Sequence, residues 1–342
     1  MPAVSSRLYG RWITGWETKL AARDTNRVVR PFEWGLEWLD GAGTGEDPAE
    51  VVRRYVEHAL EDSDGFFAYQ SPADFRLEAN HLTFTSPISS PYPCNNRVHA
   101  DFFPAPDDGR RAVLVLPQWN GDARSHVGLC KLLNRFGLTA LRLSLAYHDR
   151  RMPPHLQRAD YHVSSNIGRT IHACRQSVVD ARACLDWLQS RGYHRLAILG
   201  TSLGSCIGFI ATAHDTRVRA GVFNHVSMYF GDVVWTGLST RHVRAGLEQA
   251  VSQEALREYW KVISPATYMD RLIGRDLTSL LIWAQYDTTF LPEYSRQVVE
   301  AFRLRGLRFR EFRLPCGHYT TGCFPFNLLD GFAMCRFLAQ AL

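Results

Sequence analysis

Residues Leu196 to Gly204 read L-A-I-L-G-T-S-L-G, and this stretch decides the fold. Four apolar residues lead directly into the motif at 200–204 (G-T-S-L-G), and a helical segment, 205–214, follows it. A strand, a sharp turn and a helix are the context in which G-x-S-x-G forms a nucleophile elbow. Glycines suit the flanking positions because the turn leaves little room for a Cβ. The stretch therefore predicts that Ser202 stands on a tight turn between a buried strand and a helix.

The length and composition are those of a folded protein with one large core. The chain has 342 residues, of which 46% are hydrophobic and 21% are charged. Such a chain can bury one core and carry an inserted or appended subdomain. Its 39 basic and 34 acidic residues give a net charge of +5. Because this excess is mild and no Lys/Arg-rich run occurs, nucleic-acid binding is not expected.

No segment has the pattern of a membrane span or a signal peptide. No apolar stretch approaches the ~18 residues needed to cross a bilayer, so no integral membrane segment is expected. Residues 1–20 contain scattered charges and no apolar central region. The eight cysteines form no C-x-x-C pair. This pattern favours a reducing, cytoplasmic setting, and it leaves the oligomeric state open.

Downstream of residue 80, short apolar runs alternate with helical stripes. Two β-like segments, 81–85 and 98–103, flank a proline-containing turn and predict an antiparallel pair. Most later runs are continuously apolar, which is typical of parallel strands buried on both faces. The sequence therefore predicts an α/β protein with a mostly parallel central sheet and helices on both faces. The expected strands are 112–116, 139–145, 196–199, 220–223, 279–284 and 309–314, and the expected helices are 129–136, 178–188, 205–214, 293–304 and 328–342.

Residues 1–75 are expected to form an N-terminal helical extension. Within it, 47–50 (D-P-A-E) has the pattern of an N-cap, a proline at the first helical position and a capping-box glutamate. Four tryptophans favour aromatic packing of the extension on the main domain over a membrane-surface segment. These are Trp12, Trp16, Trp34 and Trp38.

The main domain is expected to span residues 76–342 and to carry two insertions. The connections 146–175 and 224–277 are too long for ordinary crossovers between a strand and the next element. Long insertions at strand ends are usually lids or binding loops. We expect a loop insertion at 146–175 and a helical cap over the site at 224–277.

Ser202, Asp287 and His318 each follow a predicted strand, and they occur in that order along the chain. This order and placement resemble the α/β-hydrolase superfamily, in which a serine, an acid and a histidine stand at the tips of successive strands. The resemblance covers roughly residues 80–342. It implies that Ser202 is the nucleophile, that His318 is the general base and acid, and that Asp287 orients His318.

The chemistry of acyl transfer requires each of these groups and an oxyanion hole. A serine hydroxyl is a poor nucleophile at neutral pH unless an imidazole removes its proton, and a carboxylate must orient that imidazole. Backbone N–H donors must then stabilise the tetrahedral oxyanion. The amide of Leu203 is one expected donor. The loop after 112–116 reads P-Q-W-N-G-D in place of the superfamily's usual H-G form. Trp119 or Asn120 is expected to supply the second donor, and the choice stays open.

The sequence also offers other candidates for the acid and for the nucleophile. Asp287 could be an ordinary turn residue, in which case Asp232, after the previous strand, is the reserve acid. Cys316 lies close to His318 in sequence, but it has no elbow, so a cysteine nucleophile is not favoured.

The insertion 146–175 holds a cluster of histidines and arginines. The favoured interpretation is a solvated loop with local salt bridges. The second is an anion pocket for a carboxylate or phosphate on the substrate. A metal site is the least favoured. The candidate pocket residues are His148, Arg150 and Arg151. His225 and Tyr229, at the root of the expected cap, are further candidates, and packing of the cap explains them equally well. The metal set would be His148, Asp149, His155 and His162. Overall, neither a metal nor a cofactor is expected.

The most favoured activity is hydrolysis of a small-molecule carboxylic ester or thioester through an acyl-enzyme. The segment Ile263-Ser264-Pro265 with Tyr268 is loosely similar to the dienelactone-hydrolase and prolyl-oligopeptidase-like branch. A peptidase or amidase is therefore one alternative. An acyltransferase on the same three residues is another, and a non-catalytic binding protein on a hydrolase fold is the least favoured.

Overall fold

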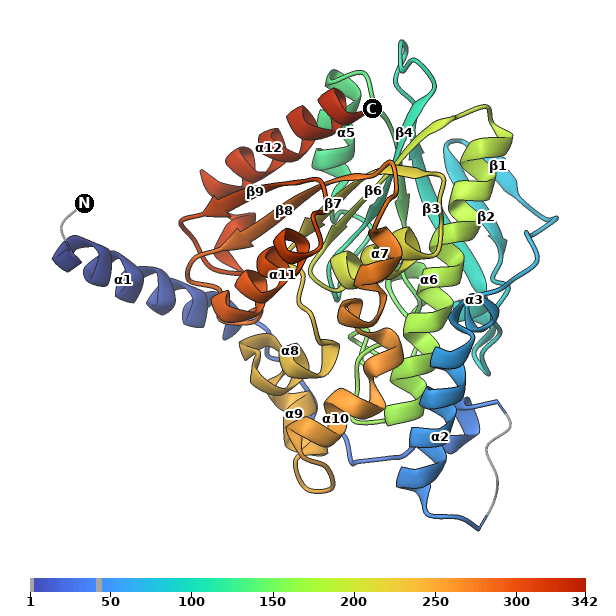
Figure 1. Cartoon of the computed structure of the whole chain (residues 1–342), viewed down its shortest axis with the longest axis vertical. Helices are drawn as coiled ribbons and strands as arrows, with labels where there is room; N and C mark the ends of the chain where they lie inside the picture. Colours follow the sequence, from blue (N-terminus) through green and yellow to red (C-terminus); the bar gives the residue numbers. More distant parts are fainter. Residues whose placement is uncertain (1–2, 41–44) are drawn as a thin grey trace.

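A nine-stranded sheet forms the centre of the computed structural model, which describes residues 3–40 and 45–342 (Figure 1). The strand order is β1-β2-β3-β5-β4-β6-β7-β8-β9. The pairs among β1, β2, β3 and β5 are antiparallel, and all pairs from β5 to β9 are parallel. The predicted mostly parallel sheet is confirmed. The strands are β1 (Arg76–Glu78), β2 (His81–Thr85), β3 (Arg97–Phe103), β4 (Arg111–Leu116), β5 (Thr139–Leu143), β6 (Arg195–Thr201), β7 (Val218–Asn224), β8 (Thr278–Ala284) and β9 (Phe309–Leu314).

Alternating side chains of the central strands pack into two separate apolar layers, one on each face of the sheet. In β4, Leu114 and Leu116 belong to one buried cluster, while Val113 and Val115 belong to the other. Because successive side chains of a strand point to opposite faces, both faces of the sheet need a helical cover. Figure 1 shows α6, α7 and α11 in front of the sheet and α1 projecting at the left. The second layer contains buried side chains of α1, α5 and α12.

Some helices connect the strands, and others lie within 1–75 and 224–277. They are α1 (Ala3–Ala21), α2 (Pro48–Glu61), α3 (Ser63–Phe66), α4 (Pro93–Asn96), α5 (Val127–Arg135), α6 (Ile167–Ser190), α7 (Leu203–Ala213), α8 (Phe230–Thr236), α9 (Arg241–Leu247), α10 (Gln253–Tyr259), α11 (Pro292–Leu304) and α12 (Phe326–Ala341). Short 3-10 segments are η1 (Leu36–Trp38), η2 (Asp149–Arg151), η3 (Leu238–Thr240), η4 (Lys261–Ile263), η5 (Pro265–Leu272) and η6 (Thr320–Gly322). No helix in the described ranges is long and apolar enough to cross a membrane.

The N-terminal 75 residues are less helical than expected. Between α1 and α2 the described chain is irregular apart from η1, because Pro31 and a left-handed Gly35 (φ 67°) interrupt helical geometry. The predicted N-cap of α2 is present, since the Asp47 side chain accepts from the amide of Ala49. Glu50 pairs with Arg53, so the expected capping box is replaced by a cap with an adjacent ion pair.

The first insertion ends earlier than predicted. Helix α6 begins at Ile167 because the Asn166 side chain accepts from the amide of Arg169 at 2.8 Å and caps the helix. The irregular part of this insertion is therefore 146–166. The second insertion contains α8, α9 and α10, in line with the helical content expected there.

The turn from β6 to α7 holds Ser202 in a backbone conformation that L-residues rarely adopt. Its φ is 57° and its ψ is −119°, and the surrounding structure must over-determine such a conformation for it to persist. A Cβ on Gly204 would lie 2.1 Å from the carbonyl oxygen of Leu116 and 2.5 Å from that of Pro117. Glycine at this position therefore lets the elbow pack directly on the loop after β4.

Gly204→Ala should destabilise the fold by about 3 kcal/mol, because the added methyl meets backbone oxygens that cannot rotate away. Thermal or denaturant unfolding measures the change. Gly15→Ala is the matched control, since nothing lies within 4 Å of a Cβ at that helical glycine, and it should be neutral or slightly stabilising. Equal stability of wild type and Gly204→Ala would contradict the packing argument.

Candidate active site

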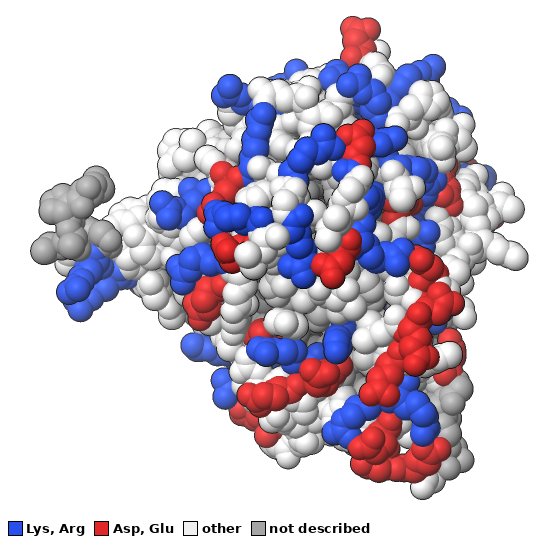
Figure 2. Space-filling model, viewed as in Figure 1, with Lys and Arg blue, Asp and Glu red and all other residues white. Residues whose placement is uncertain are grey.

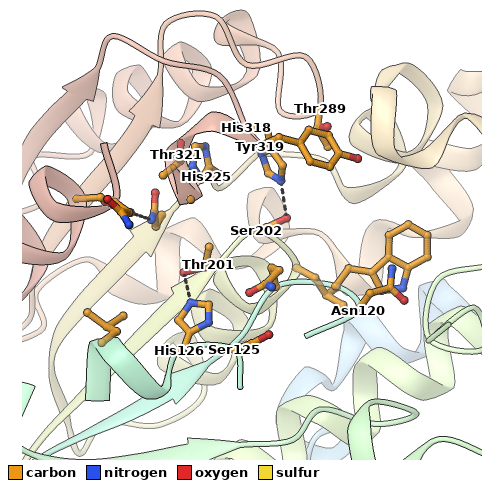
Figure 3. A pocket seen from close by; sticks show the side chains of 18 of the residues that line it. Asn120, Ser125, His126, Thr201, Ser202, His225, Thr289, His318, Tyr319 and Thr321 are labelled. Atoms are coloured by element: carbon orange, nitrogen blue, oxygen red, sulfur yellow. Dashed lines mark hydrogen bonds between the residues drawn. The ribbon is translucent and has the colours of Figure 1, made fainter. Parts of the chain in front are cut away.

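Ser202, His318 and Asp287 meet at the carboxyl ends of the parallel strands. Figure 3 shows Ser202 and His318 facing each other. The Oγ of Ser202 lies 3.2 Å from Nε2 of His318, and Nδ1 of His318 lies 3.1 Å from Oδ2 of Asp287. The serine follows β6, the aspartate follows β8, and the histidine follows β9. The structure thus brings together three predicted residues of which the first and last lie 116 positions apart in the sequence.

The Asp287 carboxylate is fixed by more than His318. Its Oδ1 accepts from the backbone amides of Thr289 and Phe290, both at 2.7 Å. Its Oδ2 also lies 2.8 Å from Nδ1 of His225, a residue with 1% exposure. Both oxygens of the carboxylate are therefore held, and two imidazoles face the same oxygen.

The electrostatics follow from this arrangement. Burial alone would raise the pKa of Asp287, but the neighbouring His318 and His225 hold it well below its usual value. Burial alone would lower the pKa of His318, but the Asp287 carboxylate raises it above its usual value, with a smaller contribution from Glu17. For His225 burial dominates, and its pKa is lowered. Asp287 is therefore the anion of the group, and His225 is neutral near pH 7.

Glu17 was not identified from the sequence, although it contacts both loops of the site. It lies on α1, is fully buried, and accepts from the backbone amides of Tyr319 (3.1 Å) and Thr320 (2.7 Å). It also accepts from the hydroxyl of Thr288 at 3.3 Å. A signal was present, because Glu17 continues the buried positions Ile13 and Ala21 at helical spacing. An acid on a buried stripe of a helix needs buried donors nearby.

A cavity of about 1110 Å³ opens beside these residues. Apolar side chains such as Val163, Phe230, Val233 and Phe290 form part of its wall, with Ser202 exposed to it. The expected oxyanion-hole residues Leu203, Trp119 and Asn120 also line it. Leu203 is the first residue of α7, so its amide has no acceptor within the helix.

The loop that carries Trp119 and Asn120 is tied to the first insertion. The indole N–H of Trp119 donates to the carbonyl of Ala159 at 3.0 Å, and the amide of Ala159 donates to Oδ1 of Asn120 at 2.8 Å. These two bonds fix the side chains of Trp119 and Asn120 on the insertion, and both residues line the cavity. Insertion 146–166 therefore supports the site by holding this loop.

Most of the candidate anion-binding residues do not line the cavity. Arg151 is fully buried and is bound to Asp180 (2.8 Å) and to the carbonyls of Asn95 and Ser144. His148 is buried and its Nδ1 bonds to the carbonyl of Ala146. These contacts are structural, because each charge or ring nitrogen meets an acceptor inside the fold.

Two further candidates also lie elsewhere. Arg150 is exposed and contacts His81 at 2.9 Å, and Tyr229 packs under the guanidinium of Arg257. Neither is among the cavity-lining residues, whereas His225 is. His148, Arg150 and Arg151 are thus not gathered into the anion pocket considered as the second interpretation. They make internal contacts instead, and Arg151 and His148 are buried where a solvated loop was favoured.

Asp232, the reserve acid, is committed to another partner. Its Oδ2 lies 2.8 Å from Arg257, and it does not contact His318. Among the described residues, the three side chains that could converge on one metal ion are His225, Asp287 and His318. The set considered from sequence is not gathered in this way, since Nδ1 of His148 and of His162 both point at the carbonyl of Ala146.

Comparison with solved structures identifies the fold. No protein-family profile and no curated protein match the sequence. Acetyl xylan esterase 1 from Thermoanaerobacterium sp. is 15% identical, with a TM-score of 0.60 over 91% of this chain and 99% of that one. An acetyl xylan esterase from Paenibacillus sp. R4 is 14% identical, with a TM-score of 0.58 over 90% and 98%. The chain therefore has the α/β-hydrolase fold.

A peptidase of the same fold is also similar, but it is much longer. The Pyrococcus horikoshii acylaminoacyl peptidase is 12% identical, with a TM-score of 0.58 over 78% of this chain. The chain spans only 42% of the length of that peptidase. The expected similarity to the α/β-hydrolase superfamily is thus confirmed for the fold.

Proposed function

We propose that the protein is a serine hydrolase that cleaves a carboxylic ester or thioester. The observation that carries the proposal is the continuous contact from the Ser202 hydroxyl through His318 to Asp287, with the serine on a strained turn. This geometry is what nucleophilic acyl transfer requires. The esterases of the same fold, whose alignments cover 91% and 90% of this chain, support the choice of an ester.

In the proposed reaction Ser202 Oγ attacks the carbonyl carbon while its proton passes to Nε2 of His318. The tetrahedral oxyanion accepts hydrogen bonds from the Leu203 amide and from the amide of Trp119 or Asn120. Collapse expels the alcohol or thiol, which takes the proton from His318 and leaves an acyl-Ser202. Water, deprotonated by His318, then releases the acid. Each step uses only groups that line the cavity or contact it.

A panel of chromogenic esters of graded acyl length tests this proposal. Turnover should favour some acyl lengths over others, because the cavity wall near Ser202 contains several apolar side chains. Amide analogues test the peptidase or amidase alternative, which the similarity to an acylaminoacyl peptidase keeps open. Product analysis with a competing alcohol distinguishes hydrolysis from acyl transfer. Absence of turnover and of fluorophosphonate labelling, with an intact fold, would favour a binding protein.

The activity should fall as the pH is lowered, with a midpoint above ~6.5, the usual pKa of histidine. Only neutral His318 can accept the serine proton, and Asp287 raises the pKa of His318. The pH profile of kcat/KM measures the midpoint. Asp330, in the cavity wall, is a second group to consider, because burial raises its pKa to about 7. Asp330→Asn should retain the acid limb; its loss in this variant would assign the limb to Asp330.

Glu17→Ala should lower kcat about tenfold or more and should also reduce stability. Removing the carboxylate leaves the buried amides of Tyr319 and Thr320 without an acceptor and frees the loop that carries His318. Steady-state kinetics, normalised to the folded fraction, measures the effect. Glu57→Ala, at an exposed position of α2, is the control. Wild-type kcat in folded Glu17→Ala would show that the contact is structural only.

A further inference from the structure

The three helices that cover one face of the sheet carry exposed charge of a single sign. Buried side chains of α1, α5 and α12 belong to the same apolar layer. Their two acidic residues, Glu17 and Asp330, are buried. All of their exposed charged residues are basic, although the whole chain has 39 basic and 34 acidic residues. These exposed cations are Arg7, Arg11, Lys19, Lys131, Arg135 and Arg336.

These cations have no internal partner. Within the described ranges, no carboxylate lies at ion-pair distance from any of the six, whereas several exposed arginines elsewhere are paired, as Arg219 is with Asp276. Blue and red side chains are interspersed over the central face drawn in Figure 2, while the projecting part of α1 at the left shows blue and white. The helical layer therefore has a net positive potential that the fold does not neutralise.

The same layer exposes an unusual share of large apolar side chains. In the described part of the chain ten large hydrophobic residues are strongly exposed, and six of them lie on α1 or at the start of α12. Scattered single residues of this kind are normal, but a group in one layer marks an interaction surface. The six are Leu8, Trp12, Phe324, Leu328, Leu329 and Phe332, and their exposures run from 49% to 74%.

The apolar and basic groups are contiguous at the junction of α5 and α12. Phe136, directly after α5, packs edge-on against Phe332 with ring centroids 5.7 Å apart. A Cβ on Gly331 would lie 3.4 Å from Leu132, so the two helices are in close contact. Lys131, Arg135 and Leu328 are exposed and line the same cavity as Ser202. The surface is thus continuous with the entrance to the site.

We propose that the outer surface of α1, α5 and α12 docks on a bilayer that contains anionic phospholipid. The apolar side chains enter the interfacial region, and the unpaired cations meet the headgroup phosphates. A second copy of the chain fits less well, because pairing this face with itself opposes two positive surfaces. A nucleic acid would satisfy the cations but leave the exposed Phe and Leu side chains without an apolar partner.

Docking also bears on the substrate, in a part of the proposal that rests on the proposed function. Because the exposed residues Leu328 and Lys131 line the same cavity as Ser202, an ester drawn from the bilayer would reach Ser202 without crossing bulk water. Membrane docking itself does not depend on Ser202. Ser202→Ala should therefore bind vesicles like wild type, so failure of the hydrolase proposal and failure of docking are distinguishable.

Vesicle flotation of the full chain tests the proposal. We expect binding to vesicles of equal parts phosphatidylcholine and phosphatidylglycerol, little binding to phosphatidylcholine alone, and weakening by salt. Lys131→Gln and Arg135→Gln should each weaken binding about fivefold. The triple variant Phe324→Ser, Leu328→Ser, Phe332→Ser should weaken it at least about tenfold.

Matched controls lie on α11, on the opposite face of the sheet. Leu304→Ser removes an even more exposed apolar residue (76%), and Arg296→Gln removes an exposed cation; both should bind like wild type. Binding equal for both lipid mixtures, or losses equal in the controls, would overturn the proposal. So would duplex DNA binding that needs the cations but not the apolar residues. Dimers that the triple variant dissociates, without vesicle binding, would assign the face to self-association.

Discussion

Ser202→Ala is expected to lower kcat for the preferred ester by about 10⁴- to 10⁶-fold, the largest effect of any single substitution in this chain. The hydroxyl supplies the atom that becomes acylated, and no neighbouring group can replace it. Ser205, three residues later, is fully buried and donates its hydroxyl hydrogen to the carbonyls of Ser202 and His225. Cys316 is buried as well, and burial raises the pKa of its thiol to about 12. Neither is available as a nucleophile.

The measurement is steady-state turnover together with covalent labelling by a fluorophosphonate probe. Wild type should be labelled on Ser202, and Ser202→Ala should show neither labelling nor turnover while unfolding like wild type. Ser190→Ala, at the exposed end of α6, is the serine control and should behave like wild type. Turnover by Ser202→Ala equal to wild type would reject the nucleophile assignment, whatever the geometry around His318.

The elbow and the strands were predictable because the local sequence dictates them. Residues 196–204 contain the strand, the two glycines and the serine in one segment, and the crowding around Gly204 is a local consequence of that turn. The strands at 81–85 and 309–314 match β2 and β9 residue for residue. Strands of a buried parallel sheet leave continuous apolar runs, so their positions are visible without any knowledge of their partners.

The contacts of Glu17 and His225 around the three central residues were not predictable in the same way, because they join segments that are far apart in the sequence. Glu17 accepts a hydrogen bond from the amide of Thr320, which lies 303 positions later in the sequence. The sequence around Glu17 does not indicate which loop supplies this donor. His225 was placed in the pocket wall from sequence, but its approach to Asp287 follows from how β7 and β8 pair. Sequence patterns report the environment of a residue more readily than its partner.

The histidine and arginine cluster at 146–166 shows how side-chain chemistry alone can suggest a binding role that the structure does not support. Side-chain chemistry alone made Arg151 a candidate for binding an anion. In the fold it neutralises a buried carboxylate, Asp180, whose pKa burial raises despite this partner. An arginine in a loop is equally suited to an internal and an external anion, and only the packing of α6 against the loop decides between them.

Asp287→Asn should lower kcat/KM by about 10⁴-fold at neutral pH, while leaving substrate binding largely intact. The carboxylate accepts on both oxygens: two backbone amides at Oδ1, and His318 at Oδ2 with His225 close by. An asparagine has one acceptor oxygen and one donor group. If its NH₂ occupies the Oδ1 position, it opposes two backbone N–H groups; if it occupies the Oδ2 position, it opposes the imidazoles. The first orientation leaves both backbone amides without an acceptor, so the second is favoured. Its NH₂ donates to Nδ1 of His318, which then carries its proton on Nε2 and cannot accept the serine proton.

The matched substitution is Asp232→Asn, because both aspartates are buried. Asp287 follows β8, and Asp232 lies on α8. Asp232 is paired with Arg257 and does not contact His318. Asp232→Asn should therefore reduce stability. It should leave kcat/KM per folded molecule within about threefold of wild type, because Arg257 takes no part in the proposed reaction. Kinetics and denaturant unfolding on both variants separate the two roles. The opposite pattern, with activity lost in Asp232→Asn and retained in Asp287→Asn, would transfer the orienting role to the cap. It would also mean that His318 turns away from β8 when substrate binds, since no contact in the present arrangement joins His318 to Asp232.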